Sequence, residues 1–106
     1  MKIESNKTIL EKINDLNYNI NYGPLKKGSD TEIIIKVEGV SHVSITKTCQ
    51  CTMPIITLLP EGGFSITIKY DPNKVGTINQ SVFERVVDEK NEQSVITFNL
   101  KGLITQ

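Results

Sequence analysis

The sequence predicts a single all-β domain, a β-sandwich of about seven antiparallel strands. Most of the chain alternates between apolar and polar residues with a period of two, which is the pattern of strands with one buried face. Turn-forming glycine, proline, asparagine and aspartate residues separate these stretches, and no long amphipathic helix interrupts them. The 106 residues are enough for one domain with its own core.

The alternating segments follow one another at short intervals. In residues 17–22, two tyrosines and an isoleucine share one face while three asparagines share the other. The clearest alternation is in residues 64–70, where Phe64, Ile66, Ile68 and Tyr70 share a face. Many short strands divided by turns indicate a sandwich or a small barrel. The expected strand segments are residues 17–22, 31–38, 43–55 (as two strands), 64–70, 77–88 and 94–101.

The segment from Val43 to Ile55 is unusually long for one strand, so we expect two strands with a kink near the cysteines. Its odd positions are apolar except for Lys47, and its even positions are polar. This predicts that Cys49, Cys51 and Met53 lie on the buried face.

The first 16 residues show no period of two, and we treat residues 1–16 as an N-terminal arm or lead-in and residues 17–106 as the sandwich. Thr8 to Glu11 fits a capping box, with apolar residues following at helical spacing. A short helix and a simple lead-in to the first strand are both open. In either case Ile9, Leu10 and Ile13 are the candidate interface residues.

Composition excludes several classes of partner. Twelve basic residues balance twelve acidic ones, so no net charge attracts nucleic acid or an anionic membrane. No apolar stretch approaches the length needed to span a bilayer, and we expect no secretory signal. Fifteen isoleucines and no alanine are typical of an AT-rich coding sequence.

No catalytic motif is present, which predicts a protein that is not an enzyme and has no small-molecule substrate. The chain has one histidine, no serine-centred elbow and no glycine-rich phosphate loop. We therefore assign no catalytic residues and no cofactor.

Cys49 and Cys51 allow three interpretations. At i and i+2 of an extended strand they are poorly spaced for a disulfide, although a tight turn would relieve this. With Met53, and with His42 as a fourth ligand, they could hold copper(I) or zinc. The interpretation we favour is that they are small core residues in an apolar stripe, so no metal ligand is assigned.

Several motifs carry a resemblance to a known family. Residues 21–28 match an aromatic-Gly-x-aliphatic-x-x-Gly opening, and residues 49–54 read Cys-Gln-Cys-Thr-Met-Pro. The turn at residues 60–63, Gly76 and the closing segment at residues 96–102 also fit. Over residues 17–104 the chain resembles a bacterial immunoglobulin-like domain family of unknown function with a Cys-x-Cys-Thr-x-Pro signature, although Gln50 replaces the family's central glycine.

The resemblance implies a seven-stranded immunoglobulin-like sandwich, like the Hydin-type and major sperm protein domains, which are interaction or scaffold modules. The chain is also similar to the small immunoglobulin-like accessory proteins of crAss-like phages. We therefore expect an auxiliary, or decoration, protein on the capsid of a tailed bacteriophage. It would be made in the host cytoplasm and would bind the major capsid protein or another virion protein at the capsid surface.

Two alternatives remain open. One is an immunoglobulin-like interaction module of the bacterial envelope or surface, since members of the family usually carry an export or lipoprotein signal. The other is a small copper or zinc carrier that uses cysteine and methionine.

Overall fold

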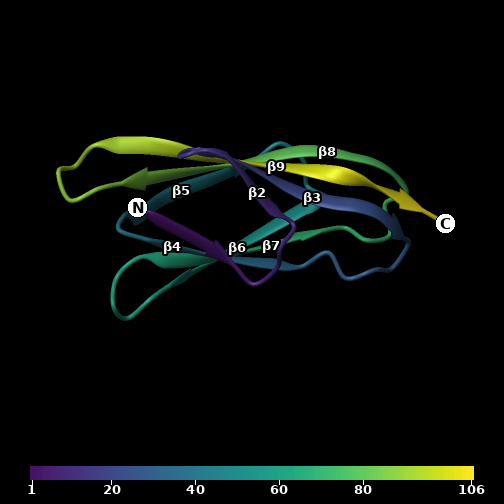
Figure 1. Ribbon diagram of the computed structural model, residues 1–106, viewed down its shortest axis with the longest axis horizontal. Helices are drawn as coiled ribbons and strands as arrows, with labels where there is room; N and C mark the ends of the chain where they lie inside the picture. The colour runs from purple at the N-terminus through teal and green to yellow at the C-terminus, as the bar shows by residue number, and fades with distance from the viewer.

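The computed structural model describes all residues from Met1 to Gln106 and contains nine strands and no helix. Two sheets face each other in an elongated molecule of 48 × 23 × 22 Å (Figure 1). The expected all-β, two-sheet architecture is confirmed. The strands are β1 (Lys2–Ser5), β2 (Leu10–Asn14), β3 (Asn17–Lys26), β4 (Ile33–Glu38), β5 (Ser41–Lys47), β6 (Thr52–Leu58), β7 (Phe64–Tyr70), β8 (Gly76–Val87) and β9 (Gln93–Thr105).

The first sheet has four strands in the order β1-β4-β7-β6, and the second has five in the order β2-β3-β9-β8-β5. All neighbouring pairs are antiparallel except β3 and β9, which run parallel. The structure therefore has two more strands than the seven expected, and one pair breaks the expected antiparallel pattern. No helix of the structure has the length and apolar character needed to cross a membrane.

The core lies between the sheets and consists of 17 buried hydrophobic residues. Strands β4, β7 and β9 supply most of it, because every second residue of each strand points inward. Ile35, Ile66 and Phe98, for example, are completely buried. Full burial of such a side chain contributes roughly 1.5–3 kcal/mol. The strict alternation in the sequence therefore places these three strands correctly.

The N-terminal segment forms strands and not a helix. β1 pairs with β4, and β2 pairs with β3, so each becomes an edge strand of a different sheet. Ile9 and Leu10 are half-buried and pack against the core, whereas Ile13 is 57% exposed. Residues 2–5 and 10–14 are therefore edge strands of the two sheets, joined by a turn at residues 6–9.

The prediction that the odd residues of 43–55 face the core is correct for Ile45, which packs against it, but wrong for Val43, Met53 and Ile55, which are exposed. Thr52, Pro54 and Ile56 turn toward the core, while Met53 and Ile55 turn outward. A register shift between His42 and Ser44 in β5, followed by the turn at residues 48–51, changes the phase of the alternation. A bulge of this kind adds one residue to one strand and so switches the faces that follow.

Candidate functional site

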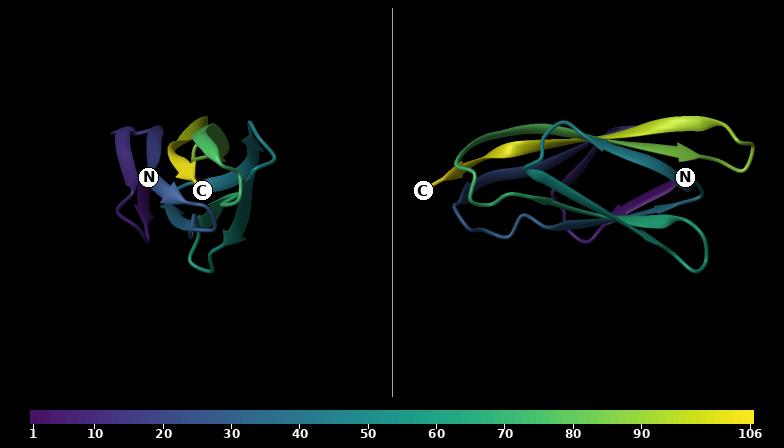
Figure 2. Two further views of the ribbon diagram at one scale, coloured as in Figure 1. Left: turned by 90° about the vertical axis from the view of Figure 1, so that its right-hand side faces the viewer. Right: turned by 180° about the vertical axis from the view of Figure 1, so that it is seen from behind.

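The sandwich has two flanks, each formed by one edge strand from each sheet. We call β1 with β2 the N-terminal flank, and β5 with β6 the β5–β6 flank. The view along the long axis shows them on opposite sides of the molecule (Figure 2, left), with the purple N-terminal strands across from the teal strands β5 and β6. Edge strands carry unpaired backbone groups and are the places where another chain can add a strand.

The N-terminal flank is short and charged. β1 has four residues and β2 has five, and each carries one lysine and one glutamate. Lys2 lies 3.1 Å from Glu4, and Lys12 lies 3.1 Å from Asp15, in exposed ion pairs. Short, charged edge strands disfavour pairing with another strand. This flank is therefore a poor docking site for a β-strand.

The β5–β6 flank has the opposite character. β6 is seven residues long, and none of them is charged. It exposes 43% of Met53, 61% of Ile55 and 72% of Leu58. Pro54, which lacks a backbone N–H, leaves one fewer donor on this strand. We identify β6 as the candidate docking strand, because it offers an uncharged edge beside exposed apolar side chains.

The strand register gathers part of this apolar surface on the outer face of the four-stranded sheet. Ile55 of β6 and Ile34 of β4 both pair with Thr67 of the intervening β7. Residues paired in neighbouring strands share a face of the sheet. Ile34, which is 38% exposed, therefore lies on the same outer face as Ile55 and Met53. We call these three residues the outer patch.

A buried ionisable pair lies beneath β5. Nδ1 of His42 in β5 contacts Oε1 of Glu84 in β8, and Glu84 is completely buried. The second carboxyl oxygen, Oε2, has no hydrogen-bond partner. Burial raises the pKa of Glu84, and the hydrogen bond from His42 opposes this shift only in part. The imidazole also packs edge-on against Phe64, with 5.6 Å between ring centroids.

Sequence reasoning missed this pair. Glu84 shares its strand parity with Val82 and Val86, both of which are buried, so the pattern alone could have placed it in the core. His42 has the parity expected of the polar face, but it precedes the bulge in β5 and therefore points inward, whereas Ile45 after the bulge packs against the core as expected.

We expected the two cysteines to be unpaired core residues of an apolar stripe, but they are bonded to each other. Cys49 and Cys51 form a disulfide within the tight turn between β5 and β6. The N–H of Thr52 donates to the carbonyl of Cys49 across this turn, at 3.3 Å. The turn provides the local geometry that an extended strand lacks.

The residues of the alternative copper or zinc site do not come together. His42 is bonded to Glu84, the two cysteines are bonded to each other, and Met53 is 43% exposed on the outer face. No group of three or more histidine, cysteine, aspartate or glutamate side chains is placed to hold a metal ion.

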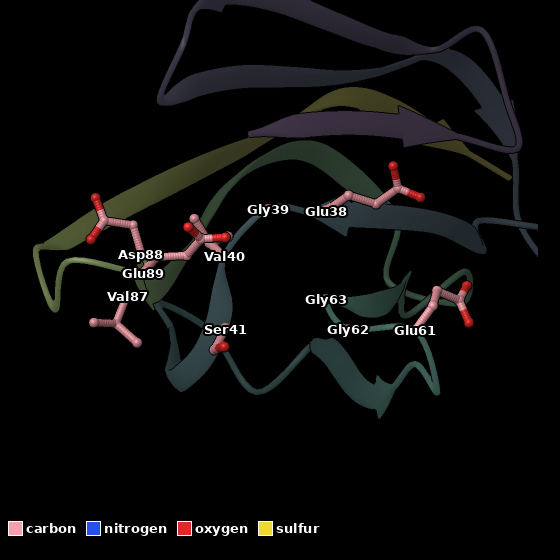
Figure 3. A pocket seen from close by; sticks show the side chains of 10 residues that line it. All are labelled: Glu38, Gly39, Val40, Ser41, Glu61, Gly62, Gly63, Val87, Asp88 and Glu89. Atoms are coloured by element: carbon pink, nitrogen blue, oxygen red, sulfur yellow. The ribbon is translucent and has the colours of Figure 1, made fainter.

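An acidic cleft of about 520 Å³ opens at one end of the molecule, where three loops meet. Its acidic side chains are Glu38, Glu61, Asp88 and Glu89. They spread around the rim and do not converge on one point (Figure 3). The cleft therefore lacks the convergent polar groups of a typical small-molecule site.

Of the three interface residues expected from the sequence, Leu10 and Ile13 belong to the N-terminal flank, and Ile9 lies in the turn that precedes β2. Ile9 and Leu10 are largely occupied with the core, and only Ile13 offers a mostly exposed side chain. Their role in binding stays a prediction.

Neither the protein-family models nor the curated proteins that were searched include one that matches this chain.

Proposed function

We propose that this chain is a non-enzymatic structural protein, an immunoglobulin-like module that binds another protein along β6. The single observation that carries the proposal is the uncharged seven-residue edge of β6 with its exposed Met53, Ile55 and Leu58. Exposed, uncharged edges of this length are unusual in proteins that act alone, because they invite pairing with other chains.

The strand order supports an immunoglobulin-like topology. If β1 and β4 to β9 are counted as seven strands in chain order, the first, second, fifth and fourth form one sheet. The third, sixth and seventh lie together in the other sheet. A sandwich of the immunoglobulin constant type has the same strand order, which supports the proposal, and β2 and β3 would be additions to it.

The partner we propose is an extended segment that pairs with the free edge of β6. Its main chain would hydrogen-bond to β6, and its apolar side chains would extend the outer patch of Ile34, Met53 and Ile55. Strand addition of this kind obtains affinity from backbone bonds and specificity from alternate side chains.

For the biological setting, we propose an auxiliary protein on the capsid of a tailed bacteriophage, with the major capsid protein as its partner. The isoleucine-rich, alanine-free composition supports an AT-rich genome, and the family resemblance supports an accessory sandwich. The Cys49–Cys51 disulfide is compatible with this setting, because disulfides persist on virion surfaces.

The same disulfide favours one alternative, an interaction module of the bacterial envelope. Compartments outside the cytoplasm are oxidising, and disulfides are rare in the cytosol. The envelope module would use the same β6 edge, so the two settings differ in the partner and not in the site.

Ile55 and Ile13 provide a matched pair of variants, because their exposed fractions are 61% and 57% and they lie on opposite flanks. Ile55→Lys places a charge on β6 and should weaken binding to assembled capsids at least tenfold in a co-sedimentation assay. Ile13→Lys should leave binding unchanged. Both substitutions are at exposed sites and should change stability by no more than about 0.5 kcal/mol.

The reverse result, in which only Ile13→Lys weakens binding, would assign the contact to the N-terminal flank. Binding of the wild-type chain to isolated bacterial envelopes and not to capsids would favour the alternative setting. If both variants bound as well as the wild type, docking on β6 would be contradicted.

A further inference from the structure

The disulfide between Cys49 and Cys51 closes a very short loop, because only one residue separates the two cysteines. A disulfide stabilises a fold mainly by restricting the unfolded chain, and the restriction is least for the shortest loops. The chain also has a 17-residue core that holds the two sheets together. A structural role alone therefore gives little reason for this bond.

The surroundings of Cys49 are those that stabilise a thiolate. The ammonium of Lys74 lies 3.7 Å from Cys49 Sγ, and the backbone N–H of Cys51 donates to the same sulfur at 3.2 Å. Neighbouring lysines and N–H donors favour the charged form of a thiol and increase its reactivity. Cys49 therefore has two donors ready for the negative charge that reduction would place on it.

Lys74 is held at this position by the backbone. The N–H of Asp71 donates to the carbonyl of Cys51 at 2.8 Å, which fixes the β7–β8 loop to the cysteine turn. The N–H of Lys74 in turn donates to the carbonyl of Asp71 at 3.2 Å. Lys74 therefore follows Asp71 by three residues, and the backbone of Asp71 is bonded to Cys51 of the disulfide.

The two sulfurs differ in their environment. Cys51 packs against the hydrophobic core, whereas Cys49 lies against the exposed Lys74. An incoming thiolate would accordingly attack Cys49, and Cys51 would be the thiol released in that first step.

From these contacts we infer that Cys49 and Cys51 form a redox-active pair that exchanges disulfides with a dithiol. A thiolate of the dithiol attacks Cys49 Sγ, the Cys49–Cys51 bond breaks, and its electron pair and a proton from water go to Cys51. The second thiolate of the dithiol then attacks the dithiol's other sulfur, which is bonded to Cys49 in the mixed disulfide. This step releases Cys49 as a thiolate beside Lys74. The dithiol is oxidised by two electrons, and the chain is reduced by two.

The test equilibrates the full chain with mixtures of reduced and oxidised glutathione, traps free thiols with a maleimide, and measures the reduced fraction by mass spectrometry. Lys74→Met removes the charge and keeps a side chain of similar length. Lys90→Met, in the exposed β8–β9 loop, is the matched control. We expect Lys74→Met to shift the equilibrium toward the disulfide by about two- to fivefold, the range for an exposed charge, and Lys90→Met to match the wild type.

A second measurement isolates the effect on Cys49. In a Cys51→Ser background, the midpoint of thiolate formation, followed by ultraviolet absorbance, should move to higher pH when Lys74 is replaced by methionine. A disulfide that stays oxidised in excess dithiothreitol while the chain remains folded would overturn the inference. Equal equilibria and equal midpoints with and without Lys74 would overturn it as well. Neither assay contains a capsid, so the result is independent of docking on β6.

Discussion

The two flanks of the sandwich are built from edge strands of the same two sheets. They differ in strand length, in charge and in the residues buried beneath them. The N-terminal flank consists of two short strands, each with one lysine and one glutamate, and its ion pairs are exposed to water. The β5–β6 flank has two seven-residue strands, and Lys47 is the only lysine, arginine, aspartate or glutamate in them. The buried His42–Glu84 pair lies on this side.

The difference shows how one sandwich can protect some edges and leave another available. Charges close the N-terminal flank to further strands at little energetic cost, because exposed ion pairs are worth only about 0–1 kcal/mol. The β5–β6 flank lacks this protection apart from Pro54. The N-terminal flank is therefore protected against strand addition, whereas β6 is not, which is why β6 is the candidate docking strand.

Deleting residues 1–14 is the most severe test of this contrast. It removes half-buried Ile3, Ile9 and Leu10 from the edge of the core, which should cost about 3 kcal/mol or more in the free energy of unfolding. It also uncovers the edges of β3 and β4, so the truncated chain should self-associate. Denaturant unfolding and sedimentation velocity measure the two effects. A stable, monomeric truncation would show that the N-terminal flank protects nothing.

Glu84→Gln tests how the buried carboxyl beneath β5 affects the stability of the fold. The pKa of Glu84 is raised in the folded protein by burial, so folding is less favourable when this carboxyl is ionised. Stability from a group of this kind is present at low pH and is lost as the pH rises through the raised pKa. The glutamine variant should therefore be more stable than the wild type at alkaline pH, and the difference should shrink as the pH falls.

Thermal unfolding across pH 4 to 9 measures the effect of Glu84→Gln. The isosteric variant Glu4→Gln, at an exposed carboxyl of the N-terminal flank, serves as its control and should show no such trend. A parallel pH profile in the two variants would contradict an unfavourable buried charge under β5.

Pro54→Val sharpens the contrast by restoring a backbone N–H to β6. The pyrrolidine ring faces inward and is partly buried, and valine is a favourable strand residue. We expect a stability change within about 1 kcal/mol and a measurable rise in self-association, read from the concentration dependence of the sedimentation coefficient. Unchanged association would show that the missing donor does not limit pairing at this edge.

The smallest effect is expected from Asp15→Asn, which removes the exposed ion pair with Lys12 on the N-terminal flank. Such a pair contributes less than about 1 kcal/mol, so the unfolding midpoint should move little and should respond less to salt. A loss much larger than this would indicate that the charges of this flank hold it together as well as protect it.

The strands with strict alternation could be predicted from the sequence, because no local feature changes their phase. Phe64, Ile66 and Ile68 lie inward as expected. The region around the cysteines could not be predicted in the same way. Its serines and threonines fit either face of a sheet, so a bulge and a tight turn change the register without disturbing the visible pattern.

The candidate site depended on that unpredictable region. The position of Met53 and Ile55 on the outer surface follows from the turn at the disulfide and not from their place in the alternation. The N-terminal strands were also missed, because short edge strands bury few side chains and leave little periodic signal. Edges and turns therefore form the candidate site, and they are the parts that periodicity describes least well.

The parallel pairing of β3 with β9 joins residues 17–26 to residues 97–105 in the middle of the five-stranded sheet. β9 follows the other four strands of this sheet in chain order and yet fills an interior position, so the sheet stays split until residues 93–105 have been synthesised. Contacts so distant in sequence slow folding, because a long loop must close before they form. During synthesis the edges of β3 and β8 are open together, and a chaperone or a neighbouring nascent chain could meet them before β9 does.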